Sequence, residues 1–252
     1  MRQSVIGCAA FAEIESTARK DVLSMDSFIY HLIVKYPELR DQEKPIWDAF
    51  NLLQATMHAG GTIFTAGNGG SYTDAEHIVG ELRKSFVLKR PIPAALSEDI
   101  KKIDPVYGTI LAQSLQEPIR ASSLPSEGAL TTAFINDVNA ETLIAQEFYG
   151  LADMYDCLFL ISTSGNSQNL RYAAIVAKAK HIPVILLTGP NKGSIEKYAD
   201  VVIRGKGRTT AEIQDQHTPI YHCLCQMLED EKFAQVQPAS VSEHKLNGGE
   251  DE

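Results

Sequence analysis

The sequence predicts an α/β fold: a doubly wound, five-stranded parallel sheet sandwiched by helices, with an N-terminal helical hairpin. Short runs rich in apolar and β-branched residues alternate with longer stretches of helical periodicity. These runs are apolar on both faces, which is typical of parallel strands covered by helices on both sides. A length of 252 residues with 44% hydrophobic content fits one large domain with a sizeable core.

The helical hairpin is expected at the start of the folded domain. Ser27 can cap the first helix, and Pro37 closes it. Pro45 lies where a helix start tolerates proline, and Gly60 and Gly61 end the second helix. The expected strands are 62–66, 130–134, 157–161, 183–188 and 201–204. The expected helices among and after them are 73–86, 140–151, 168–180 and 210–229.

The domain boundaries follow from composition. Residues 1–24 form an N-terminal extension of no clear class, and 25–234 form the domain. Residues 88–127 contain two short helical patterns, prolines and basic side chains, so we expect a helical insertion that forms a lid or an oligomer contact. A surface excursion with solvated charges is the alternative. Residues 235–252 carry few large apolar side chains and end on acids, which predicts a disordered acidic tail.

Composition excludes several functions. Thirty-two acidic against 23 basic residues give a net charge of −9, which disfavours nucleic-acid and anionic-membrane binding but leaves room for a small anion pocket. No apolar run approaches a membrane span and no signal peptide is recognisable, so we expect a soluble cytoplasmic protein. Four cysteines give no disulfide framework. We expect Cys223, Cys225 and His217 to be structural.

A glycine-rich turn follows the first expected strand. Gly67, Asn68, Gly69, Gly70 and Ser71 lie between a strand and a helix, where exposed amides and the helix dipole attract anions. The spacing fits neither the dinucleotide-binding fingerprint nor a P-loop. The alternative is that a tight turn requires these glycines.

Hydroxyl side chains gather after the strand expected at 157–161. Ser162, Thr163, Ser164 and Ser167 precede a helix, whose free amides add further donors. A phosphate monoester offers several acceptor oxygens and suits such a site, whereas a plain helix cap needs one hydroxyl. The sequence therefore predicts a phosphate-binding loop.

Asn136 and Asp137 follow the strand expected at 130–134. Ligands of open α/β sheets collect at the carboxyl ends of the strands, so both side chains are candidates for substrate contact. Capping of the next helix, ahead of Ala140, is an equally good interpretation of the spacing.

Four further polar residues form two helical pairs. His77 and Glu81 are spaced i, i+4, about 40° apart on one helix face. Gln214 and His222 are spaced i, i+8, about 80° apart, with Pro219 between them as a possible kink. Together the four can hold a divalent transition metal or supply an acid/base pair. By spacing alone, His77 and Glu81 also fit an ordinary surface pair.

Four segments carry a family resemblance: AGNGGSYTDAEHIVGEL, FIND, ISTSGNSQN and IQDQHTPIYH. In this order they resemble the sugar isomerase (SIS) domain, and within it most closely the phosphoheptose isomerases. The resemblance spans roughly 27–233, except the long segment before Leu130. That family interconverts sedoheptulose 7-phosphate and D-glycero-D-manno-heptose 7-phosphate through an enediol.

The resemblance implies a role for each matching position. The residues expected to contact substrate are Asn68, Gly69, Gly70, Ser71, Asn136, Asp137, Ser162, Thr163, Ser164, Ser167 and Gln214. The residues expected to bind zinc are His77, Glu81, Gln214 and His222. Glu81 is the expected catalytic base and His222 the expected acid. The family also implies a homotetramer with sites between subunits, in which the helix of Gln214 and His222 completes a neighbour's site.

Two departures from the family bear on the substrate. An arginine commonly lies shortly after the glutamate in the family, whereas Leu82-Arg83-Lys84-Ser85 follows Glu81 here, and the segment 88–127 is longer than usual. The alternatives are a non-catalytic sugar-phosphate-binding regulator or adaptor and an isomerase of another phosphorylated sugar. Presence of all four expected metal ligands favours an enzyme.

Overall fold

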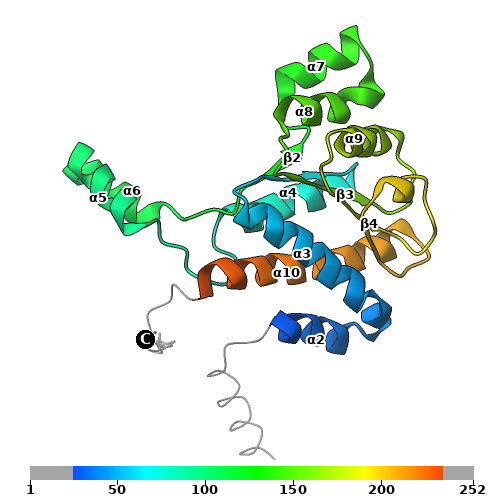
Figure 1. The fold of residues 1–252 in the computed structure, drawn as a ribbon, viewed down its shortest axis with the longest axis horizontal. Helices are drawn as coiled ribbons and strands as arrows, with labels where there is room; N and C mark the ends of the chain where they lie inside the picture. Colours follow the sequence, from blue (N-terminus) through cyan, green and yellow to red (C-terminus); the bar gives the residue numbers. More distant parts are fainter. Residues whose placement is uncertain (1–24, 235–252) are drawn as a thin grey trace, which may run out of the picture.

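The computed structural model describes residues 25–234, so the expectations for 1–24 and 235–252 lie outside the described residues. Five parallel strands form one sheet in the order β2-β1-β3-β4-β5, which confirms the predicted doubly wound α/β class (Figure 1). The strands are β1 Ile63–Ala66, β2 Ala121–Leu124, β3 Cys157–Ser162, β4 Val184–Thr188 and β5 Val201–Arg204.

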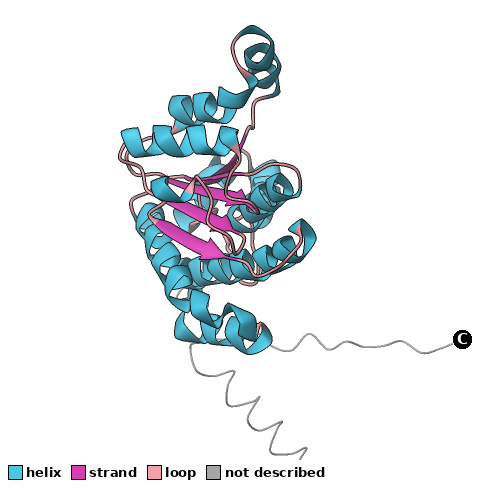
Figure 2. Ribbon diagram, turned by 90° about the vertical axis from the view of Figure 1, so that its right-hand side faces the viewer, coloured by secondary structure: helices cyan, strands magenta, loops and turns pink. Residues whose placement is uncertain are grey.

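Helices cover both faces of the sheet (Figure 2). The α-helices are α2 Met25–Lys35, α3 Glu43–His58, α4 Gly70–Arg83, α5 Ala94–Ile103, α6 Pro105–Ser114, α7 Gly128–Asp137, α8 Leu143–Leu151, α9 Gln168–Ala179 and α10 Thr210–Phe233. The 3-10 helices are η1 Pro37–Gln42, η2 Ala140–Thr142 and η3 Glu196–Tyr198. The predicted N-terminal hairpin is confirmed as α2 and α3.

Alternation along the strands explains the two layers of core. Ile161 and Leu187 pack into one cluster with α2, α3, α4 and α10. Their neighbours Leu160 and Leu186 pack into the opposite cluster with α8 and α9. Since successive side chains point to opposite faces, a strand covered on both sides must be apolar throughout.

The prediction of a strand at 130–134 is wrong. That segment belongs to the surface helix α7, and the true strand is Ala121–Leu124 at the sheet edge. An edge strand is less covered, and Ser122 and Ser123 are accordingly only half-buried. The β-branched Thr132 is accommodated in α7, where its hydroxyl donates to the Gly128 carbonyl at 3.2 Å.

The segment 88–127 is therefore helical only in part. Helices α5 and α6 pack on each other and project from the body of the molecule (Figure 1). Asp104 begins α6 by accepting hydrogen bonds from the amides of Val106 and Tyr107. After this arm the chain returns to the sheet as β2. A role for the arm as lid or oligomer contact stays a prediction.

Candidate active site

The glycine turn joins β1 to α4 at the carboxyl edge of the sheet. Gly69 has a φ of 54°, which favours glycine, and a Cβ on Gly67 would overlap the Ser71 carbonyl oxygen. The Asn68 amide exchanges two hydrogen bonds with Asn169 at the start of α9, at 3.0 and 2.8 Å. Ser71 is buried, and its amide donates to the Asn68 carbonyl at 3.0 Å. These hydrogen bonds connect the glycine turn to the start of α9.

The hydroxyl-rich loop after β3 reaches the start of α9. Ser162 is buried and its hydroxyl lies 3.3 Å from that of Ser167, whereas Thr163 is half-buried and Ser164 exposed. Gly165 has a φ of 63° and turns the loop toward the helix. Hydroxyls and the first amides of α9 are thus presented together, as an anion site requires.

A cavity of about 420 Å³ lies beside the glycine turn. Its walls include Asn68, Gly69 and Asn169, with Pro125 after β2 and Ile135 of α7. The carboxyl ends of the strands therefore do open into a hollow at this edge.

Asn136 and Asp137 do not end a strand, contrary to expectation. Both are exposed at the last turn of α7, and the Asn136 amide donates to the Asp137 carboxylate at 2.7 Å. The preceding Ile135 lines the cavity beside the glycine turn, so α7 still brings both residues near it. The alternative that Asn136 or Asp137 caps the helix ahead of Ala140 is wrong as well. The residue that caps this helix is Asn139, whose side chain accepts a hydrogen bond from the Glu141 amide.

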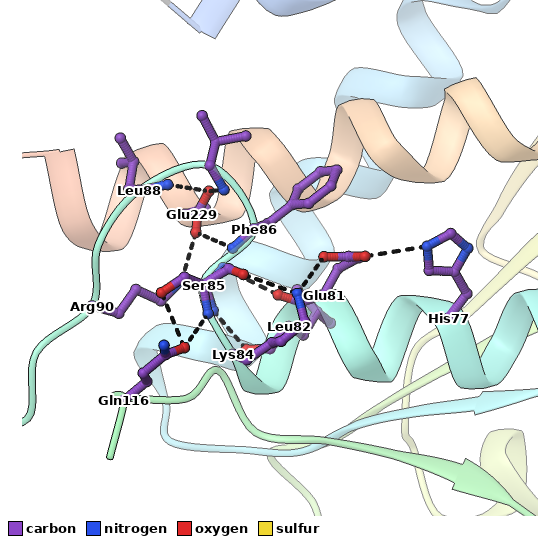
Figure 3. A network of polar contacts seen from close by, with 11 residues as sticks. His77, Glu81, Leu82, Lys84, Ser85, Phe86, Leu88, Arg90, Gln116 and Glu229 are labelled. Carbon is purple, nitrogen blue, oxygen red and sulfur yellow. Dashed lines mark hydrogen bonds and ion pairs between the residues drawn. The ribbon is translucent and has the colours of Figure 1, made fainter. Parts of the chain in front are cut away.

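The second half of the candidate site lies between α4 and α10. His77 Nε2 donates to Glu81 Oε1 at 3.1 Å (Figure 3). The other ring nitrogen of His77, Nδ1, lies 2.9 Å from the Tyr221 hydroxyl. The His222 ring centroid is 5.0 Å from that of His77, edge to face. Helix α10 is continuous through Pro219, so the two helices bring these residues together.

The surroundings set the charge of this cluster. Burial, followed by the neighbouring His77, lowers the pKa of His222, while Glu81 acts in the opposite direction. Burial raises the pKa of Tyr221 to about 12, so the phenol is neutral. The Lys84 ammonium lies 3.4 Å from Glu81 Oε2, opposite the contact with His77. The Glu81 carboxylate thus lies between two donors.

Gln214 lies apart from the other expected metal ligands. A Cβ on Gly70 would come within 2.5 Å of its Nε2, which places Gln214 against the glycine turn. Among residues 25–234, no three His, Cys, Asp or Glu side chains are arranged as metal ligands. The donor types nevertheless suit zinc. In the same range, the buried Nε2 of His222 has no hydrogen-bond partner, as a free ligand atom would.

A second cavity, of about 590 Å³, lies between α2 and α10 and includes His222. It shares no described lining residue with the cavity at the glycine turn. Within one chain, His222 of α10 thus lies beside His77 and feels the charge of Glu81 on α4. In the same chain, His222 and the glycine turn line different cavities.

Sequence reasoning missed three contributors to the site: Tyr221, Asn169 and the ion pair of Arg90 with Glu229. Tyr221 and Asn169 lie inside the segments that carry the family resemblance, so their place in those segments was the available signal. The predicted buried thiols Cys223 and Cys225 and the structural His217 are confirmed as buried. Within 25–234, every helix is too short or too polar to cross a membrane.

Comparison with known proteins agrees with this architecture. Residues 126–222 match the SIS domain family. The phosphoheptose isomerase of Mycobacterium tuberculosis is 31% identical over 185 residues, which are 73% of this chain and 81% of that protein. The phosphoheptose isomerase of Shewanella frigidimarina is 28% identical over 217 residues, covering 85% and 97% of the two chains.

Solved structures show the same fold. A phosphoheptose isomerase structure from Neisseria gonorrhoeae superposes with a TM-score of 0.60 at 25% identity, covering 81% of this chain and 96% of that one. One from Francisella tularensis gives 0.62 at 24% identity, covering 87% and 97%.

Proposed function

Because this chain belongs to the phosphoheptose isomerase family, we propose that it interconverts sedoheptulose 7-phosphate and D-glycero-D-manno-heptose 7-phosphate. The observation that carries the proposal is the contact of Glu81 with His77, whose ring packs edge to face on His222 of α10. A protein that only binds sugar phosphates needs the phosphate loop alone. The adjacent carboxylate and imidazoles add the groups that proton transfer requires.

The phosphate group would be held by the loop after β3. Thr163, Ser164 and Ser167 offer hydroxyl donors, and the first amides of α9 add backbone donors and the helix dipole. Asn68, fixed by Asn169, would orient the sugar next to this loop. Binding energy gained far from the reacting carbons would then serve to align them with the catalytic groups.

Isomerisation would proceed through a cis-enediol. Glu81 would remove the proton from the carbon next to the carbonyl, and His222 would return a proton to the adjoining carbon. The Glu81 carboxylate is in contact with two donors, His77 at one oxygen and Lys84 at the other. Burial lowers the pKa of His222, so the neutral ring would first take the proton of the substrate hydroxyl and then deliver it as the acid, while the proton held by Glu81 passes to the former carbonyl oxygen.

We propose zinc as the cofactor, with His77, Glu81 and His222 as ligands and Gln214 as the fourth. Bound zinc would stabilise charge that develops on the enediol oxygen, as a Lewis acid. The unpartnered Nε2 of His222 supports this assignment, whereas Gln214 would have to leave the glycine turn. Metal analysis of the purified protein and of a His77→Ala variant tests it. One zinc per chain, lost in the variant, is the expected result.

We further propose a cytoplasmic homotetramer whose sites lie between subunits. The separate cavities at His222 and at the glycine turn support this arrangement, since a second copy could bring one beside the other. Light scattering coupled to gel filtration tests the assembly, and a monomer that is fully active would contradict it.

The function is tested by Glu81→Gln with a matched control. Glu231 of α10 forms a second histidine–glutamate pair, 3.3 Å from His58 and away from the site, so Glu231→Gln controls for loss of such a pair. We expect Glu81→Gln to abolish turnover of sedoheptulose 7-phosphate while phosphate binding persists, and Glu231→Gln to retain both. Substantial activity of the Glu81→Gln variant would exclude Glu81 as the catalytic base.

A further inference from the structure

A buried ion pair lies directly behind the candidate base. Arg90 Nε donates to Glu229 Oε1 at 2.7 Å, and the two side chains are 0% and 1% exposed (Figure 3). The rest of the guanidinium donates to the last turn of α4, to the carbonyls of Leu82 at 2.8 Å and Glu81 at 3.2 Å. These carbonyls have no partner within the helix, so Arg90 caps α4 at the residue that carries the base.

The Glu229 carboxylate organises the chain that leaves α4. Besides Arg90, its Oε1 accepts from the amide of Phe86 at 2.9 Å. Its Oε2 accepts from the amides of Val87 at 2.8 Å and Leu88 at 3.1 Å. Both oxygens are therefore used, each by two donors. Only a carboxylate can accept at both atoms without turning a donor toward these amides.

The same network reaches the candidate acid. The Phe86 ring centroid lies 5.2 Å from that of His222, so the amide held by Glu229 fixes the ring that packs on His222. Glu229 follows His222 by seven residues, nearly two turns, and the two share one face of α10. One ion pair thus touches the backbone of Glu81 and the packing partner of His222.

Stability alone explains this pair poorly. Two charges taken out of water lose hydration that their attraction only partly restores, and apolar residues of similar size often serve a core equally well. What an ion pair with six directed hydrogen bonds adds is a fixed geometry. We propose that Arg90 and Glu229 are positioning residues that hold Glu81 and His222 in register across α4 and α10. This inference rests on the proposed catalytic roles of those two residues.

Glu229→Gln is the decisive variant, because its amide would face two N–H donors. A matched control is Asp156→Asn, which also disrupts a buried carboxylate that accepts two amide hydrogen bonds, from Thr62 and Asp153 at 2.6 Å each. Asp156 lies at the amino ends of β1 and β3, opposite the site. If the Gln variant does not fold, Arg90→Lys keeps the charge and loses the fork that caps α4.

Two readouts separate positioning from simple destabilisation. For folded Glu229→Gln we expect kcat for sedoheptulose 7-phosphate to fall about tenfold to a hundredfold, with KM within about twofold. We also expect the His222 ring signal, assigned with His222→Asn in a histidine-labelled NMR spectrum, to shift as Phe86 moves. Asp156→Asn should lower the melting temperature and change neither.

An unchanged kcat or an unmoved His222 signal in the folded Glu229→Gln variant would overturn the positioning role. Wild-type protein without isomerase activity would instead contradict the proposed function. In that case the His222 signal still decides whether the ion pair sets the geometry of the cluster, because it needs no turnover.

Discussion

Substitution of His217 should change how stability depends on pH. His217 is fully buried on α10, and its Nε2–H donates to the Thr188 carbonyl at 3.2 Å. Within the described part of the chain, its buried Nδ1 has no partner. A proton on Nδ1 would therefore create a buried cation that lacks an acceptor. Burial lowers the pKa of His217 from 6.5 to about 4, the Thr188 contact opposing it only in part.

The sign and size of the effect follow from this difference. Between pH 6.5 and about 4 the unfolded chain binds a proton that the folded chain does not, so the free energy of unfolding falls as the pH falls. The contribution is complete above pH 6.5. At about 1.36 kcal/mol per pH unit, about 3.4 kcal/mol is lost below pH 4, and about 2 kcal/mol of this by pH 5.

Urea unfolding of wild type and His217→Gln at one fixed protein concentration measures the difference. The glutamine amide can still donate to Thr188 but does not titrate. We expect the stability of wild type to fall more steeply than that of the variant between neutral pH and pH 5, by about 2 kcal/mol. Parallel pH profiles for the two proteins would refute the argument, because carboxylates elsewhere affect both alike.

Two further predictions concern the loops of the candidate site. Asn68→Ala removes the paired bonds to Asn169 and should raise KM for the sugar phosphate several-fold, about 1 kcal/mol, in steady-state kinetics; an unaltered KM would exclude Asn68 from substrate binding. Gly165→Ala forces a side chain onto a φ of 63° and should lower stability by about 1 kcal/mol in thermal denaturation. Gly150→Ala, at an exposed position of α8, is its control, and equal melting temperatures for both variants would contradict the strain.

The sheet was predictable wherever a strand is buried on both faces. β3 and β4 are apolar and fully buried over nearly their whole length, so their composition identifies them. β2 lies at the edge of the sheet with two half-buried serines. The segment of α7 is more apolar and therefore resembles a buried strand more closely than β2 does. Exposure on one side removes the pattern that identifies a buried strand.

The site was predictable where residues close in sequence act together. The glycine turn and the hydroxyl loop each join a strand to a helix within a few residues. Spacing alone did not place His222 beside His77; the family resemblance did. The contacts of His77 with Tyr221 and of Arg90 with Glu229 join residues 144 and 139 positions apart. Such contacts depend on how α4 and α10 pack, which local patterns do not encode.

Proton–deuterium exchange tests the central claim most directly. The protein is incubated with zinc and sedoheptulose 7-phosphate in heavy water, and the sugar is followed by NMR. We predict deuterium at the carbon next to the carbonyl, together with appearance of the aldose, and neither in Glu81→Gln. Absence of exchange in the wild-type protein, with phosphate-dependent binding retained, would contradict the proposed isomerase and point to another sugar phosphate or to a binding role.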